Sequence, residues 1–409
     1  MVETMNIGIV TTWFERGAAY VSKIYKQLLE EGGHSVYIFA RGGENHKSKG
    51  APEWNEACVT RSDKFCNTRI EKKKFYKWIK RNKLECLFFN EQHDYKVLVW
   101  MRRDFPNLKL GAYVDYYTED TLKYYRMYDF LVCNTKRHIQ AMNFHKQKYY
   151  IEWGTDIDLY NLVERTDDEL VFFHSAGMSV RKGTDILVES FIEHKLYKSA
   201  RLIIHTQIPI EKLCGYNKSE LTEFCITIIE KTVSAPGLYH LGDVYVYPTR
   251  LDGLGLTMYE ALACGMPLIT TDFPPMNEVG DKEIVRHIKV KDFYCRGDAY
   301  YFPMCICDKD SLAEQMRWFI DRKEKLQKMK EKARQFAVDH YDIKAKTKVV
   351  CRAFEDAKKL ETDDQLCKEI LICTFRHTSV MEWLESYWSY HRFRSVLRSF
   401  PKNLTHREK

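Results

Sequence analysis

Short apolar runs that alternate with helical stretches constrain the fold of this chain more than any other feature of its sequence. Residues 5–10 read as a buried strand, and the next stretch carries apolar residues at helical spacing and ends at Gly32 and Gly33. Residues 36–40 then read as a second strand. A strand, a helix and a second strand in this order predict a right-handed βαβ unit with parallel strands.

The same alternation continues through the chain and breaks once, in a polar stretch that ends at Asp168. Apolar runs typical of parallel strands occur at residues 84–89, 110–114, 130–133, 170–174, 202–205, 244–247 and 267–271. Strands that are separated by helices build doubly wound sheets. We therefore expect an α/β fold with two Rossmann-like domains that face one another across a cleft.

The length of 409 residues fits two domains of ordinary size. The break in the pattern places the first domain at residues 1–152 and the second at 169–343, with a hinge or linker at 153–168 between them. Residues 344–409 are expected to form a C-terminal appendage of helices followed by a basic, aromatic tail.

Composition indicates the compartment in which such a chain works. The sequence contains no run of about 18 apolar residues that could span a bilayer, and residues 1–16 lack the segments of a secretion signal. The 13 cysteines are scattered and odd in number. This usage favours free thiols in a reducing compartment over a disulfide framework, and we expect a cytoplasmic protein.

The segment at residues 244–267 carries the most specific chemistry. A strand ends in a glycine-containing loop that opens a helix, so unpaired N–H groups and the helix dipole favour an anion such as a phosphate. Asp252 and Glu260 flank this loop, and their carboxylates suit sugar hydroxyls. The residues expected to line the phosphate site are Gly253, Leu254, Gly255, Leu256 and Thr257.

This segment resembles the E-x7-E donor signature of the family 4 glycosyltransferases, which have the GT-B fold. Asp252 stands where the family usually has its first Glu, and the spacing to Glu260 matches. The resemblance implies that Glu260 holds the ribose hydroxyls of a nucleotide and Asp252 the hydroxyls of the transferred sugar. Asp is shorter than Glu by one methylene, which leaves the identity of the sugar open. The alternative is an ordinary loop and helix of a Rossmann-like domain.

A second match begins the C-terminal half, at residues 172–183. A strand runs into a loop that carries the adjacent cations Arg181 and Lys182, which suit a pyrophosphate leaving group. Lys182 matches the family's Lys, whereas Met178 occupies the place of the family's Arg. Arg181 is therefore the candidate replacement, and surface charge is the alternative for the pair.

Two positions of the N-terminal half match the family less closely. Gly17 is the only glycine of the loop that corresponds to the family's glycine-rich loop near the donor phosphates. Asp115 follows a strand, roughly where the family has a residue beside the reacting sugar, and a helix cap is its alternative role. The resemblance implies an acceptor-side first domain, a donor-nucleotide second domain, and catalytic roles for Arg181, Lys182, Asp252 and Asp115.

We expect neither a metal nor a cofactor beyond a nucleoside-diphosphate sugar as co-substrate. The third glycine of a nicotinamide-binding loop is missing, and there is no Walker P-loop. The pairs Asp156/Asp158 and Asp308/Asp310 imitate metal-binding D-x-D motifs, but they fall in the hinge and at a helix start, where capping is the expected role. His205 is expected in the wall of a base pocket or in the core.

Two basic, aromatic stretches, residues 69–83 and 383–400, are of a kind that can bind the surface of a membrane. In the first, Phe75, Trp78 and Ile79 share one helical face and lysines occupy the others. Such a helix can bind anionic lipid peripherally, or its apolar face can belong to the core of the first domain. The tail leaves the same two alternatives open. Nucleic acid is not expected as a partner, because no recognition motif accompanies the charge.

The resemblance to family 4 implies a retaining, metal-independent hexosyltransferase. It would move a sugar from a nucleoside-diphosphate sugar to a glycan, a glycolipid or another lipid-linked acceptor. Two alternatives remain open, namely another GT-B enzyme such as a sugar-nucleotide epimerase or a phosphorylase, and a non-catalytic protein that binds a sugar nucleotide.

Overall fold

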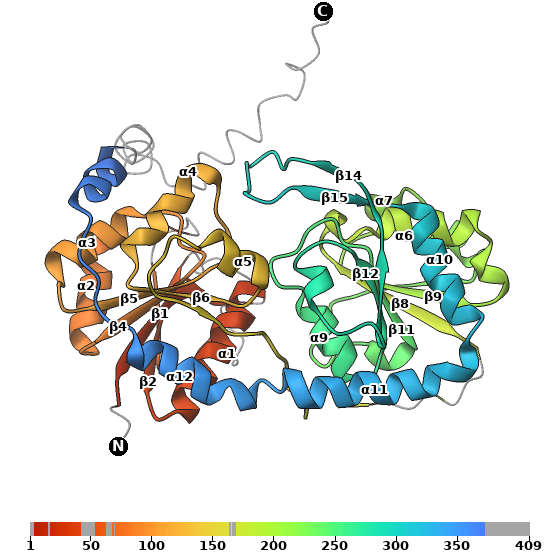
Figure 1. Cartoon of the computed structure of the whole chain (residues 1–409), viewed down its shortest axis with the longest axis horizontal. Coiled ribbons are helices and arrows are strands. Elements are labelled where there is room, and N and C mark those ends of the chain that lie inside the picture. The colour runs from red at the N-terminus through yellow and green to blue at the C-terminus, as the bar shows by residue number, and fades with distance from the viewer. Residues whose placement is uncertain are drawn as a thin grey trace, which may run out of the picture.

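The computed structural model describes residues 4–14, 17–41, 54–62, 68, 70–162, 165 and 169–372. It consists of two α/β domains that lie side by side, each built on its own parallel sheet (Figure 1). The predicted α/β class with two Rossmann-like domains is confirmed.

The first sheet has seven strands in the order β3-β2-β1-β4-β5-β6-β7. They are β1 (Asn6–Thr12), β2 (Ser35–Arg41), β3 (Val59–Arg61), β4 (Cys86–Asn90), β5 (Lys109–Tyr113), β6 (Phe130–Cys133) and β7 (Lys148–Tyr150). The helices of this domain are α1 (Gly17–Glu31), α2 (Lys72–Arg81), α3 (Lys96–Asp104), the short α4 (Glu119–Leu122) and α5 (Lys136–Ala141).

The second sheet has six strands in the order β10-β9-β8-β11-β12-β13. They are β8 (Val171–Gly177), β9 (Arg201–Thr206), β10 (Ile226–Glu230), β11 (Val244–Tyr247), β12 (Leu268–Thr271) and β13 (Val285–Ile288). Its helices are α6 (Thr184–Glu193), α7 (Glu211–Cys214), α8 (Lys218–Thr222), α9 (Leu256–Ala263), α10 (Lys309–Ile320) and α11 (Lys323–Tyr341).

In both sheets the strand order changes direction next to the first strand. β1 pairs with β2 on one side and β4 on the other, and β8 pairs with β9 and β11 in the same way. Ligands of doubly wound sheets bind beyond the carboxyl ends of the strands at such switch points. The loops after β1, β4, β8 and β11 are therefore the natural walls of a site.

An antiparallel hairpin of β14 (Val290–Tyr294) and β15 (Met304–Cys307) extends from the second domain toward α4 of the first (Figure 1). The backbone N–H of Tyr301 donates to the carbonyl of Tyr117 at 2.9 Å. The ring of Tyr300 stacks on that of Tyr116, with centroids 5.2 Å apart. The hairpin thus contacts both domains, and the sequence pattern did not predict it.

The chain crosses between the domains at two places that lie side by side. Thr155 donates its N–H to the carbonyl of Tyr341 at 2.8 Å, and Ile343 donates to Thr155 at 3.0 Å. A β-carbon on Gly154 would lie 2.4 Å from the Tyr341 oxygen, so only glycine fits this close approach. The first crossing falls at the start of the hinge that was expected at residues 153–168.

After the second crossing the chain returns to the first domain as α12 (Thr347–Asp356). Phe354 packs against Phe88 and Phe130 with ring centroids 4.9 and 5.0 Å away. Leu366 and Ile370, in the helical stretch 364–372, are buried in the same domain. The described part of the expected appendage thus completes the first domain, and the tail at 383–400 lies outside the described residues.

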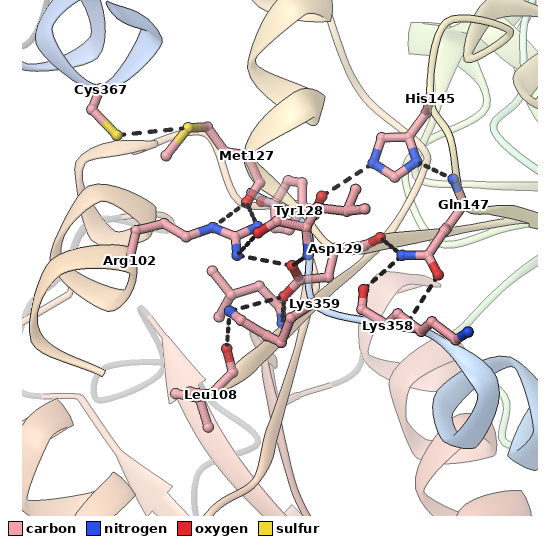
Figure 2. A network of polar contacts seen from close by, with 12 residues as sticks. Arg102, Leu108, Met127, Tyr128, Asp129, His145, Gln147, Lys358, Lys359 and Cys367 are labelled. Carbon is pink, nitrogen blue, oxygen red and sulfur yellow. Dashed lines mark hydrogen bonds and ion pairs between the residues drawn. The ribbon is translucent and has the colours of Figure 1, made fainter. Parts of the chain in front are cut away.

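A buried carboxylate holds this returning segment in place (Figure 2). Asp129 is fully buried, and its oxygens accept hydrogen bonds from Arg102 at 2.8 Å and from the backbone N–H of Leu360 at 2.7 Å. Lys359 donates to Asp129 at 3.3 Å and to the Leu108 carbonyl at 2.7 Å. The buried charge is thus satisfied jointly by α3 and by the returning chain.

The apolar face of the basic helix α2 belongs to the core of the first domain. Phe75, Trp78 and Ile79 are buried there, and Phe75 contacts Phe39 with centroids 4.8 Å apart. This face is therefore not available to lipid, and the core alternative holds for it. In the part of the chain that the structure describes, no helix is long and apolar enough to cross a membrane, and the cysteines are free thiols.

Candidate functional site

A cavity of about 560 Å³ lies between the domains. Its walls come from the loops at the switch points of both sheets and from the hairpin. It brings together eight residues predicted from the sequence, namely Gly17, Asp115, Arg181, Asp252, Gly253, Leu254, Gly255 and Leu256. Glu91, His93, Tyr116, Arg296, Asp298 and Tyr300 line it as well and were not predicted.

A second cavity, of about 450 Å³, adjoins the first and shares Leu256 with it. Its walls include Thr257 and Glu260 from α9, the loop at residues 233–239, and His205 at the end of β9. His205 thus lines this cavity and is largely buried, and its role in a base pocket stays a prediction. Leu256 thus lies at the border of the two cavities, and Glu260 lines the second.

Lys182 and Asp252 form the polar centre of the site. The ammonium group of Lys182 donates to the Asp252 carboxylate and to the hydroxyl of Tyr247, and this hydroxyl donates to the same carboxylate oxygen. Burial alone would favour the neutral acid. The nearby cations of Lys182 and Arg181 outweigh it and hold the pKa of Asp252 well below its usual range. Asp252 is therefore a carboxylate at neutral pH.

Arg181 lines the cavity, whereas Met178 does not. The guanidinium of Arg181 donates to the carbonyl of Leu251 at 3.2 Å and to the hydroxyl of Ser179 at 3.2 Å. Met178, which holds the position of the family's Arg, is 68% exposed. Burial lowers the pKa of the adjacent Lys182, although Asp252 counteracts this effect. One cation, Arg181, thus lines the cavity, and the other, Lys182, is bound to Asp252 in its wall.

The glycines of the loop before α9 are required by its geometry. Gly255 is the N-cap of α9 with φ of 76°, a left-handed conformation that favours glycine. A β-carbon on Gly253 would lie 2.4 Å from Oδ1 of Asp115. The carboxyl group of the first domain therefore sits directly against the backbone of the loop in the second.

Asp115 does not cap a helix, because Thr118 is the N-cap of α4. Burial, and after it the charge of Glu91, raises the pKa of Asp115 to about 7, while Arg137 and Arg181 act in the opposite direction. The capping alternative for Asp115 is therefore wrong. Asp308, in contrast, caps α10 by accepting from Ser311 at 2.7 Å, as expected.

Glu260 lies on α9, four residues after Leu256. It lines the second cavity and accepts a hydrogen bond from the hydroxyl of Tyr239. Burial raises its pKa, and the hydrogen bonds from Tyr239 and Tyr160 partly offset the rise. In the described ranges, no three His, Cys, Asp or Glu side chains are grouped so that they could hold a metal ion.

Residues 163–336 match the family described as glycosyl transferases group 1. The resemblance to glycosyltransferases is confirmed. The matched region contains the cationic loop, the glycine loop and α9 of the second domain.

The O-antigen biosynthesis glycosyltransferase WclY of Escherichia coli is 26% identical over 117 residues, which are 28% of this chain and 32% of WclY. The match thus spans about a third of the length of this curated relative.

Solved structures share the arrangement of both domains. Sucrose-phosphate synthase from Thermosynechococcus elongatus superposes with a TM-score of 0.65 at 14% identity, over 87% of this chain and 100% of that one. The pneumococcal O-GlcNAc transferase GtfA, in complex with UDP and GlcNAc, gives 0.62 at 11% identity, over 90% and 99%. Anabaena HepE, in complex with UDP and glucose, gives 0.61 at 14% identity, over 86% and 100%. The chain has the GT-B fold of these proteins.

Proposed function

We propose that this chain is a retaining, metal-independent hexosyltransferase of the family 4 type. It transfers a sugar from a nucleoside-diphosphate sugar to a glycan, a glycolipid or another lipid-linked acceptor. The observation that carries the proposal is that Arg181 and the Asp252–Gly255 loop line one cavity between the domains, where the Asp252 carboxylate binds Lys182.

The donor fits the two adjoining cavities in one orientation. The nucleoside occupies the second cavity, where Glu260 accepts from the ribose hydroxyls. The diphosphate lies at the entrance of α9, facing Arg181 and Lys182, and the sugar extends into the first cavity beside Asp252. GtfA and HepE are each described in complex with UDP and a sugar, which supports a nucleotide sugar as donor.

The chemistry in this proposal is stabilisation of a leaving group. The bond between the sugar and the diphosphate breaks while the acceptor oxygen bonds to the same face of the sugar, and the proton of the acceptor hydroxyl passes to the departing diphosphate. Negative charge grows on the diphosphate as this bond breaks. The cations of Arg181 and Lys182 therefore stabilise the transition state more than the bound donor. In this proposal Asp115 acts beside the reacting sugar, and its position against Gly253 supports this role.

The acceptor side of the first cavity suits a carbohydrate. Glu91 and Asp298 offer carboxylates to hydroxyl groups, and the stacked rings of Tyr116 and Tyr300 offer apolar surface. These residues come from the first domain and from the hairpin. The hairpin would thus contribute to the choice of acceptor.

Screening of nucleoside-diphosphate sugars by thermal shift, followed by transfer assays with a panel of glycans and glycolipids, tests the proposal. Product NMR should show the anomeric configuration of the donor, and inversion would rule out family 4 chemistry. Incubation with donor alone distinguishes an epimerase, which would convert the donor sugar without any acceptor. A donor that binds but is never transferred would instead support a non-catalytic role.

We further propose a cytoplasmic location with peripheral, electrostatic contact to anionic membranes. The support is the outer face of α2, where Lys73, Lys77 and Lys80 are exposed while the apolar face is buried. This contact would bring the enzyme to a lipid-linked acceptor without inserting any side chain into the bilayer.

A further inference from the structure

Arg137 belongs to the first domain but binds the second. It lies in α5 and is only 4% exposed. Its guanidinium donates to the carbonyls of Pro274 at 2.9 Å and Asp252 at 2.5 Å, and to the Tyr300 hydroxyl at 3.3 Å. The guanidinium also lies over the ring of Phe302, 4.5 Å from its centroid. Every one of these partners belongs to the second domain.

A carboxylate of the second domain also binds the backbone of Arg137. Glu278 follows β12, and its two carboxylate oxygens accept the backbone N–H groups of Lys136 at 2.5 Å and Arg137 at 2.9 Å. Unpaired N–H groups of this kind occur at the start of every helix and are normally satisfied within the same domain or by water. Here their partner comes from across the interface, so both ends of Arg137, backbone and side chain, are held by the second domain.

These contacts reach both walls of the proposed active site. The carbonyl of Asp252 that Arg137 binds belongs to the residue whose carboxylate pairs with Lys182. The Tyr300 hydroxyl that Arg137 binds in turn donates to the carbonyl of Asp115 at 3.1 Å. Arg137 therefore joins the backbone of the donor loop to the segment that carries Asp115, although it does not line the cavity itself.

The contacts can exist only while the domains are closed. A buried guanidinium is costly unless its donors are bonded, and the carbonyls that accept from the two terminal nitrogens of this one move away when the domains separate. Arginine suits the role because its planar fork reaches several carbonyls at once, whereas a lysine ammonium is a single point. Closure and the geometry of the donor loop are thus linked through one side chain.

We propose that Arg137 is a positioning residue that couples closure of the two domains to the placement of the Asp252–Gly253 loop. Its expected effect on turnover rests on the proposed function, whereas its effect on closure does not. Glu278 acts with it from the opposite domain.

Small-angle scattering and kinetics of Arg137→Ala, Arg137→Lys and Glu278→Gln test the coupling. The radius of gyration of the free protein should increase in all three variants. With donor and acceptor present, kcat should fall by about tenfold or more, while the dissociation constant of the donor changes by less than about threefold, because the loop is misplaced rather than lost. Arg137→Lys should remain impaired, since it keeps the charge but not the fork.

Arg103→Ala is the matched control, because Arg103 is an exposed arginine of the same domain that pairs with its neighbour Asp104. It should leave both the scattering and kcat unchanged. Glu278→Gln keeps the test open if Arg137→Ala fails to fold. A radius of gyration equal to wild type in the folded variants, or an unchanged kcat, overturns the coupling. If the wild-type chain turns over no donor, the proposed function fails. The radius of gyration of the variants then decides by itself whether Arg137 holds the domains closed.

Discussion

Lys182 donates a hydrogen bond to the carboxylate of Asp252, although 69 residues separate them in the sequence. The ion pair joins the cationic loop after β8 to the acidic end of the loop after β11. Tyr247, the last residue of β11, donates to the same carboxylate oxygen and so fixes the position of the pair relative to the sheet. In the proposed reaction this cation is shared between Asp252 and the diphosphate, and the pair keeps it in place before the donor arrives.

Replacement of Lys182 by methionine should lower kcat/KM by about tenfold or more, since a lost hydrogen bond to a charged group costs about 1.5–3 kcal/mol. Methionine keeps most of the length of the side chain, so packing is little affected. Lys212→Met, at an exposed position of α7, is the control. Steady-state kinetics with equal kcat/KM for both variants would remove Lys182 from the site.

Replacement of Glu260 by glutamine should weaken binding of the free nucleoside diphosphate by about tenfold, because a neutral amide accepts hydrogen bonds from ribose hydroxyls less strongly than a carboxylate. Calorimetric titration measures this directly and needs no acceptor. Tyr239→Phe, which removes one of the two tyrosine donors to Glu260 but keeps the ring, should have a smaller effect. Unchanged affinity in Glu260→Gln would mean that the ribose lies elsewhere.

Replacement of Asp115 by asparagine should flatten the dependence of stability on pH. The folded chain raises the pKa of Asp115 from 3.8 to about 7. Between these values the native state holds a proton that the unfolded chain has released, so the free energy of unfolding falls as pH rises through this window. Urea unfolding of wild type and variant from about pH 4 to about pH 8 measures the difference. Parallel curves would contradict the burial of Asp115 against Gly253.

The sequence predicted the parts of this structure that bury continuous apolar runs. Strands such as β6 and β11 were located to the residue, because both faces of a central parallel strand are covered. Edge strands were missed. β3, for example, is partly exposed at every position, so no apolar run marks it.

The site was predictable where one segment carries its own chemistry, as in the glycine loop at Gly253 and Gly255. Residues that act across the interface gave no such signal. Arg137 reads in the sequence as an ordinary helical arginine, and only tertiary packing reveals that it binds the carbonyl of Asp252. Tyr247 could have been suspected, since it closes the strand that leads directly into the signature, but its hydrogen bond to Asp252 depends on the turn between them.

Transferase activity should persist in excess EDTA. In the proposed reaction, Arg181, Lys182 and the N-terminus of α9 supply the positive charge that a divalent cation would otherwise bring to the diphosphate. The assay compares initial rates in EDTA, in buffer alone, and with added Mg²⁺ or Mn²⁺. Loss of activity in EDTA that added metal restores would show that these residues are not sufficient.

The lysine face of α2 should hold the protein reversibly on anionic vesicles. Because Phe75, Trp78 and Ile79 are buried in the first domain, the attraction can only be electrostatic. It should therefore weaken steeply with salt, since screening acts within about 10 Å at 0.1 M ionic strength. Co-sedimentation with anionic and neutral vesicles, at low and at physiological salt, measures this behaviour.

The charge variant of α2 that replaces Lys73, Lys77 and Lys80 by glutamate should abolish this sedimentation, because each surface cation contributes about 1 kcal/mol near an anionic membrane. Lys323, Lys325 and Lys328 are exposed on α11, and their replacement by glutamate is the control, because it changes the net charge by the same amount. Equal loss in both variants would show that binding follows overall charge and not the α2 face. Sedimentation that neither variant reduces, but that deletion of residues 379–409 removes, would instead assign the contact to the tail.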